Sequence, residues 1–245
     1  MSPPAVSALI IGNEVLTAKV VEANGAHLVR RFRERGVRLQ SLHVVTDEVD
    51  CIVEALLLAR RRAAFVVTSG GVGPTHDDVT VRAVSLALGR RVVTVPRLAA
   101  LLRQVWGAHE PPPEAMRMAE APEGWELVES ADDRFPVVLC DGVFMLPGVP
   151  ELFKVQLEAV LGRLPGTPVA LRSLFLRSRE SDIASALDRL ARDLPQVAFG
   201  SYPTFDRTLD HKVKVTIEHE DPGTVEAAAV RLRADLPQGS IVREE

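Results

Sequence analysis

Cysteine is scarce in this sequence. Only Cys51 and Cys140 occur among its 245 residues, too few for the disulfide framework that stabilises small secreted proteins. Neither has a second cysteine or a histidine at the spacing typical of a zinc site. We therefore expect no disulfide-rich fold and no cysteine-ligated metal centre, and both thiols should be reduced.

A net positive charge and long apolar runs are lacking as well. The net charge of −4 and the pI of 5.9 give no bulk attraction for nucleic acid or an anionic membrane. No apolar run approaches the roughly 20 residues needed to span a bilayer, and Met1-Ser2-Pro3-Pro4 lacks the charged region of a signal peptide. We expect a cytoplasmic protein whose partners include neither nucleic acid nor a membrane.

A glycine-rich loop is the most informative feature that the sequence does contain. The run Ala63–Val67 has the length and β-branched content of a buried strand, and Val81–Leu88 is a helical run closed by Gly89. Between them the chain reads Ser69-Gly70-Gly71-Val72-Gly73-Pro74-Thr75-His76-Asp77-Asp78-Val79-Thr80. The order is therefore strand, glycine loop, helix.

This order is the one required for phosphate binding. The first turn of a helix leaves backbone N–H groups unpaired and favours an anion there. Gly70, Gly71 and Gly73 have no Cβ, so a phosphate can lie against their backbone without a clash. Thr75 adds a hydroxyl donor. We predict that these four residues bind phosphate.

Asp77 and Asp78 follow the glycines and need a separate explanation. Carboxylates beside a phosphate repel it unless a divalent cation lies between them, and Mg²⁺ is the natural mediator. The alternative is that the glycines form only a tight turn and that one aspartate caps the helix. The familiar nucleotide fingerprints do not fit, because a dinucleotide loop would need glycine at His76 and no Gly-Lys-Ser/Thr follows.

Expected strands and helices alternate around this loop, which predicts a mostly parallel, doubly wound α/β sheet with the site at the strand carboxyl ends. The expected strands include Val6–Ile11 and Val37–Val45, and the expected helices include Val20–Glu34 and Glu48–Arg62. Further on, Asp141-Gly142 between two apolar runs predicts a hairpin whose second strand leads into Pro147-Gly148.

The turn-rich run Leu164–Pro168 predicts a domain boundary, with residues 1–165 before it and 166–245 after it. The second part is expected to be a small βαββαβ unit, a ferredoxin-like pattern. Its expected elements are Leu171–Leu176, Ser181–Leu194, Val197–Ser201, Lys212–Glu218, Thr224–Leu236 and Ser240–Val242.

Four separated motifs carry a family resemblance: Gly12-Asn13-Glu14, Val45-Thr46-Asp47-Glu48, the glycine loop and Leu146-Pro147-Gly148-Val149-Pro150. Residues 5 to 162 resemble the molybdopterin-binding MoaB/Mog domain family, in the branch of the CinA N-terminal domain and the domain fused to FAD synthases. The tail resembles the small subdomain that follows in that branch. The resemblance implies a three-layer α/β/α sandwich, a phosphorylated pterin or nucleotide across the strand carboxyl ends, and a homo-oligomer.

Roles for single residues follow from the same motifs. The resemblance implies that Asp47 and Asp78 are catalytic and hold a divalent metal such as Mg²⁺, and the position of Asp77 beside Asp78 makes it a further candidate metal ligand. It implies ligand contacts for Gly12, Glu14, Pro147 and Gly148, and phosphate contacts for Gly70, Gly71, Gly73 and Thr75. Each has a structural alternative: Asp47 could cap the helix expected at Glu48, Glu14 could begin a loop, and the Pro-Gly pair could form a rigid turn.

One segment departs from the CinA pattern. Where CinA proteins carry Asn-x-x-Gly-x-Ala-Pro-Gly, this sequence has the segment Ser130–Pro136, and Phe135-Pro136-Val137-Val138 instead resembles the FAD-synthase branch. Our leading hypothesis is a metal-dependent hydrolase of a nucleotide phosphoanhydride, such as that of ADP-ribose or FAD. Molybdopterin binding or adenylyl transfer in cofactor biosynthesis is one alternative, and a ligand-binding or oligomer-forming module without turnover is another.

Overall fold

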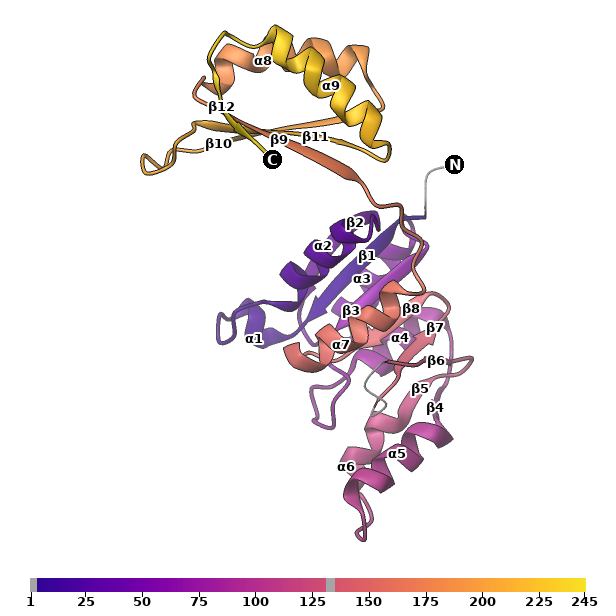
Figure 1. Cartoon of the computed structure of the whole chain (residues 1–245). Coiled ribbons are helices and arrows are strands. Elements are labelled where there is room, and N and C mark those ends of the chain that lie inside the picture. The colour runs from indigo at the N-terminus through magenta and orange to yellow at the C-terminus, as the bar shows by residue number, and fades with distance from the viewer. Residues whose placement is uncertain (1–3, 131–134) are drawn as a thin grey trace. The chain divides into compact units, whose positions relative to one another are not determined.

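The computed structural model describes residues 4–130 and 135–245. The N-terminal tripeptide and residues 131–134 of the segment compared above lie outside them. The chain divides into two compact units between Gly166 and Thr167. Figure 1 shows each unit as a sheet with its own helices.

The first unit is built on a six-stranded sheet in the order β2-β1-β3-β8-β7-β6. The first four strands in this order are mutually parallel, whereas β7 and β6 add antiparallel pairs at one edge. The strands are β1 (Val6–Ile11), β2 (Leu39–Val45), β3 (Phe65–Ser69), β6 (Glu126–Val128), β7 (Val137–Cys140) and β8 (Val143–Leu146).

Helices cover both faces of this sheet (Figure 1). On one face α2 (Asn24–Glu34) and α7 (Pro150–Leu161) bury a core that contains Leu28, Phe32 and Phe153. On the other face α3 (Val49–Arg60) and α4 (Thr80–Leu88) bury a core that contains Ile52, Leu56 and Val84. The expected three-layer α/β/α sandwich is thereby confirmed.

A smaller cluster extends the first unit beyond these layers. Here α5 (Pro96–Trp106), α6 (Pro113–Met116) and the 3₁₀-helix η1 (Arg117–Ala119) accompany the paired strands β4 (Val92–Thr94) and β5 (Glu120–Pro122). Their apolar residues Val95, Leu98 and Leu102 pack with Ala119 and Ala121. The stretch 113–119 is thus an α-helical turn followed directly by a 3₁₀ turn.

The predicted hairpin is confirmed. Asp141 and Gly142 have φ angles of 45° and 80°, as a two-residue turn with two left-handed positions requires. They join β7 to β8, so β8 runs parallel to β3 and ends beside it. The hairpin therefore delivers Pro147 and Gly148 to the edge of the sheet at which β3 ends.

The helix expected from Val20 begins later in the structure. A short helix, α1 (Asn13–Leu16), comes first, and Ala18 then takes a left-handed φ of 56°, which no regular helix accommodates. Helix α2 starts at Asn24 in consequence. This difference matters for the site because it leaves residues 12–23 as a connection beside the end of β1.

The second unit is an antiparallel sheet in the order β10-β11-β9-β12 with two helices. Leu174, Val215, Ile183 and Leu232 form part of its separate core. This is the expected ferredoxin-like βαββαβ arrangement. Its elements are β9 (Ala170–Leu176), α8 (Glu180–Asp193), β10 (Ala198–Pro203), β11 (Val213–His219), α9 (Pro222–Asp235) and β12 (Ile241–Glu244).

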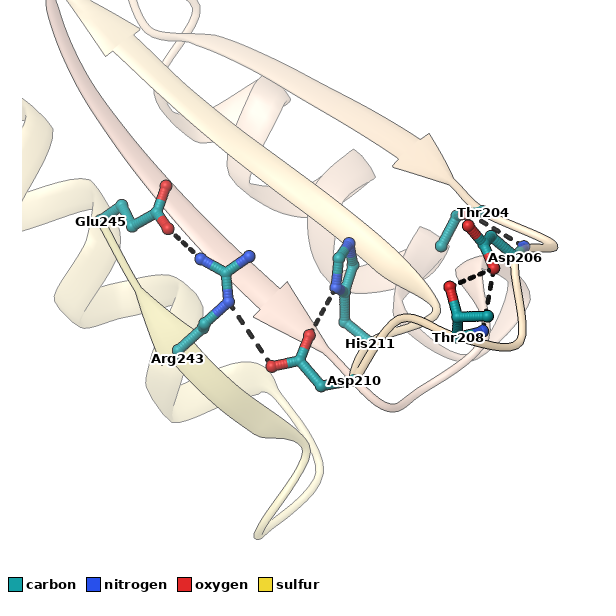
Figure 2. A network of polar contacts seen from close by, with 7 residues as sticks. All are labelled: Thr204, Asp206, Thr208, Asp210, His211, Arg243 and Glu245. Atoms are coloured by element: carbon teal, nitrogen blue, oxygen red, sulfur yellow. Dashed lines mark hydrogen bonds and ion pairs between the residues drawn. The ribbon is translucent and has the colours of Figure 1, made fainter.

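Polar side chains tie the β10–β11 connection and the end of β12 together within this unit. Nδ1 of His211 lies 2.8 Å from Asp210, whose other carboxylate oxygen lies 3.5 Å from Nε of Arg243 (Figure 2). The pKa of Asp210 is lowered, chiefly by its hydrogen bond to His211. Arg243 also stacks 3.5 Å from the ring centroid of Phe175. We see a structural role in this network, since it holds strands to one another.

Candidate functional site

The four parallel strands of the first unit end at one edge of the sheet, and each end leads into a predicted motif. Gly12 follows β1, Asp47 follows β2, Gly70 follows β3 and Pro147 follows β8. The strand order places β2 on one side of β1 and β3 on the other, which makes a topological switch point. A ligand crevice is expected outside such a point.

A cavity of about 660 Å³ lies there. This volume falls in the range of small-molecule sites. The predicted site residues that line it are Gly12, Glu14, Asp47, Gly70, Gly71, Gly73, Asp77, Asp78, Pro147 and Gly148. Thr75 is not among the described lining residues.

Gly70 and Gly71 are required by the fold of the loop itself. Their φ angles are 104° and 69°, which disfavour any other residue. A Cβ at Gly70 would lie 2.2 Å from the carbonyl oxygen of Ile11, and one at Gly71 would lie 2.3 Å from Oγ1 of Thr80. Thr80 closes the loop, since its hydroxyl donates to the Gly70 carbonyl at 2.8 Å and its N–H donates to the Gly71 carbonyl at 2.9 Å.

Neither aspartate of the loop caps helix α4. The helix begins at Thr80 with Val79 as N-cap and has no side-chain cap. Asp78 instead accepts two hydrogen bonds on one carboxylate oxygen, from the N–H of Thr75 at 2.7 Å and from its hydroxyl at 2.5 Å. The Thr75 hydroxyl is thus engaged by Asp78, three residues along the chain, and its contact with phosphate stays a prediction.

Asp47 is likewise not a helix cap. Helix α3 begins at Val49, and its N-cap is Glu48. The Asp47 carboxylate accepts a hydrogen bond from Nδ2 of Asn13, in α1. Asn13 is a site residue that the motif analysis did not single out, although it stands inside the motif Gly12-Asn13-Glu14. Its partner lies 34 positions away, so only the fold reveals the contact.

The site is rich in acids. Five carboxylates line the cavity: Glu14, Asp47, Asp77, Asp78 and Glu120. The pKa of Asp77 lies below its ordinary value, chiefly because of the nearby Thr75 hydroxyl, although the hydrogen bond of that hydroxyl goes to Asp78, and to a lesser degree because of its own backbone N–H and of His76. Within residues 4–130 and 135–245, no three His, Cys, Asp or Glu side chains lie close enough together to hold a metal ion.

These acids suit a hard cation that brings other ligands with it. Mg²⁺ is usually bound through one or two carboxylates, with water and substrate phosphates completing its octahedron. The oxygen-only donor set of the cavity fits this pattern, and a closed all-protein cage is not needed.

The Pro-Gly loop is tied to the glycine loop by a buried asparagine. Asn24, the first residue of α2, is 6% exposed and donates from Nδ2 to Oγ of Ser69 at 3.0 Å and to the Gly148 carbonyl at 2.8 Å. Ser69 in turn donates to the Pro147 carbonyl at 3.2 Å. These hydrogen bonds therefore hold together the segments that follow β3 and β8.

Apolar side chains form much of the cavity wall, and the sequence analysis did not predict them. They come from α4, α5, η1, β7, β8 and α7, which are distant in the chain. One wall can hold the flat, weakly polar part of a ligand while the loops hold its phosphates. The apolar lining residues include Val72, Val81, Leu98, Met118, Phe135, Val138, Met145, Leu152 and Val155.

Comparison with protein families gives two matches that together span nearly the whole chain. The family described as "Probable molybdopterin binding domain" matches residues 7–176, and "FAD synthase, middle domain" matches residues 168–245.

No helix in the described part of the chain is long and apolar enough to cross a membrane.

Several relatives match large parts of the chain. A CinA-like protein of Myxococcus xanthus is 33% identical over 80% of this chain, and a probable FAD synthase of Caenorhabditis elegans is 30% identical over 96%. The alignment covers 50% of each of these two proteins. The crystal structure of CinA from Thermoplasma acidophilum matches with a TM-score of 0.61 and 28% identity, over 66% of this chain and 98% of that one.

Proposed function

Because the chain belongs to the family of probable molybdopterin binding domains, we propose that it binds a phosphorylated nucleotide or pterin and hydrolyses a nucleotide phosphoanhydride of the ADP-ribose or FAD type with a divalent metal. The observation that carries this proposal is that the loop glycines Gly70 and Gly71 line the same cavity as Asp47 and Asp78. Phosphate-binding backbone and metal-binding carboxylates are the two components that such a reaction needs.

The loop supports the proposal through its backbone. Gly70 and Gly71 have positive φ angles and line the cavity. Because neither has a side chain, a phosphate can approach their peptide groups directly. Helix α4 follows within ten residues and adds the positive end of its dipole. We assign the phosphates of the ligand to this end of the cavity.

The acids support it through their position. Asp47 and Asp78 would hold the cation, without Asp77 as a third ligand in this geometry. A bound cation would neutralise the diphosphate and lower the pKa of an attacking water. Asn13 and Thr75 orient the two carboxylates. The apolar wall would exclude bulk water and hold the ring system at the other end of the ligand.

The test is AMP release from ADP-ribose and from FAD, followed by chromatography, with Mg²⁺, Mn²⁺ or Co²⁺ added. We expect cleavage that requires metal and that Asp78→Asn reduces by about 10²-fold or more. Asp188→Asn, which removes an exposed carboxylate of α8 in the second unit, is the matched control and should leave the rate unchanged. Cleavage that survives Asp78→Asn, or no cleavage of either dinucleotide with any metal, would refute the proposed hydrolysis.

Molybdopterin binding or adenylylation is the second candidate. It is favoured by the family match and by the apolar wall, against which a planar pterin can stack. Tight binding of molybdopterin without dinucleotide cleavage would favour it over hydrolysis. Neither cleavage nor any rise in the melting temperature with these ligands would favour a module without turnover.

A further inference from the structure

Arg117 is the one cationic side chain among the described residues that line the cavity. The same lining contains the five carboxylates named above. A phosphoanhydride ligand is itself an anion, so it needs positive partners in this wall. A divalent cation supplies part of that charge, and within the described lining only Arg117 can supply more.

The guanidinium of Arg117 is placed at the glycine loop. Arg117 opens η1 and is exposed, and its Nη1 donates to the Thr75 carbonyl at 3.3 Å. That bond brings it to the segment that ends in Asp77 and Asp78. One long hydrogen bond to a backbone carbonyl uses one of the five N–H donors of the side chain.

The arginines of the neighbouring helix behave differently. On α5, Arg97 is paired with Glu129, and Arg103 is paired with Glu110 at 3.1 Å. Arg117 forms no ion pair with any residue of the described ranges, although acids surround the same cavity. Its remaining donors are available to a ligand, which is the arrangement expected of an anion-binding arginine.

We propose that Arg117 is a specificity-determining residue that binds the second phosphate of the ligand, the one not held by the backbone of Gly70 and Gly71, so that the site selects ligands with two bridged phosphates over monophosphates. The proposal rests on the proposed function for the location of the phosphates. A planar guanidinium can span two phosphate oxygens with parallel N–H bonds, whereas an ammonium acts as a point charge. The hydrogen bond to the Thr75 carbonyl holds this side chain in place beside the loop.

The test compares the binding of ADP and AMP, each with Mg²⁺, to the full chain by titration calorimetry. We expect the unsubstituted protein to bind ADP more tightly than AMP. Arg117→Gln should weaken ADP binding by about 10- to 100-fold and AMP binding much less, so that the preference collapses. Arg117→Lys should restore part of it, and Arg103→Gln, which removes an equal charge outside the cavity, should change neither affinity.

Each other outcome has a definite meaning. If Arg117→Gln weakens ADP and AMP equally, the side chain only supports the loop and the inference is overturned. An unsubstituted protein that binds ADP no better than AMP overturns it as well. Dinucleotide cleavage is measured on the same samples. If the unsubstituted protein cleaves no dinucleotide but Arg117→Gln still loses the preference for ADP, the proposed hydrolysis is refuted and the role of Arg117 in binding is supported.

Discussion

At the scale of single residues, each of the two central carboxylates of the site has its own donor. Asn13 donates to Asp47, and Thr75 donates to Asp78. Both donors lie near the acid in space but differ in chain distance, since one is 34 and the other three positions away. Carboxylates that bind metals are commonly oriented by such partners, so the donors should matter to activity without touching the ligand.

Asn13→Ala should therefore lower metal affinity by about 10- to 100-fold, because Asp47 loses the bond that orients it. The measurement is the dependence of kcat/KM on metal concentration, with circular dichroism to verify that the variant is folded. We expect saturating metal to recover most of the rate. A variant with unchanged metal dependence would show that Asn13 plays no part in positioning Asp47.

A comparison of Gly70→Ala with Gly89→Ala separates two costs of replacing a glycine: the strain of a left-handed φ angle and the clash of the added Cβ. At Gly89, the C-cap of α4, φ is 64° and a Cβ would meet nothing within 4 Å, so only the conformational cost of about 1 to 2 kcal/mol is expected. At Gly70 a Cβ would also lie 2.2 Å from the Ile11 carbonyl oxygen. Urea unfolding should show the larger loss of stability for Gly70→Ala; equal losses would mean that the loop relaxes freely.

At the scale of elements, Asn24 joins three of them. It lies at the start of α2, and its amide reaches the end of β3 and the Pro-Gly loop that follows β8. Asn24→Ala should cost about 1 to 3 kcal/mol in the free energy of unfolding, because the buried Ser69 hydroxyl and the Gly148 carbonyl lose their donor. Asn24→Asp should be at least as harmful, since a carboxylate cannot donate to the Gly148 carbonyl. Denaturant titrations of the two variants provide the measurement, and a stable Asn24→Asp would contradict the assignment.

Local chemistry explains which elements could be predicted from the sequence. Asp141-Gly142 specifies its turn within two residues, and Gly89 ends α4 in the left-handed conformation that glycine favours. The four motifs could be placed at one sheet edge because parallel strands share a carboxyl end. Arg117, Asn24 and the apolar wall were not predicted, since each acts through contacts between elements that no local pattern encodes.

At the scale of the whole molecule, the family matches and the structure place the boundary between the two parts of the chain at different residues. The molybdopterin-binding match runs to residue 176, whereas the two compact units separate at Gly166 and Thr167. Strand β9, Ala170–Leu176, lies in the disputed stretch. It pairs with β11 on one side and β12 on the other, and Leu174 and Leu176 are fully buried in the core of the second unit. By its contacts, β9 belongs to the second unit.

Two fragments test this assignment. Residues 167–245 include β9 and should unfold cooperatively in urea, as expected of a unit with its own core. Residues 177–245 lack it, so β11 and β12 lose the strand that joins them and Ile183 loses apolar partners in the core. We expect the shorter fragment to show no cooperative transition by circular dichroism. Because the phosphate loop and its acids all lie before residue 167, ADP with Mg²⁺ should leave the midpoint of the longer fragment unchanged. A shorter fragment as stable as the longer one would return β9 to the first unit.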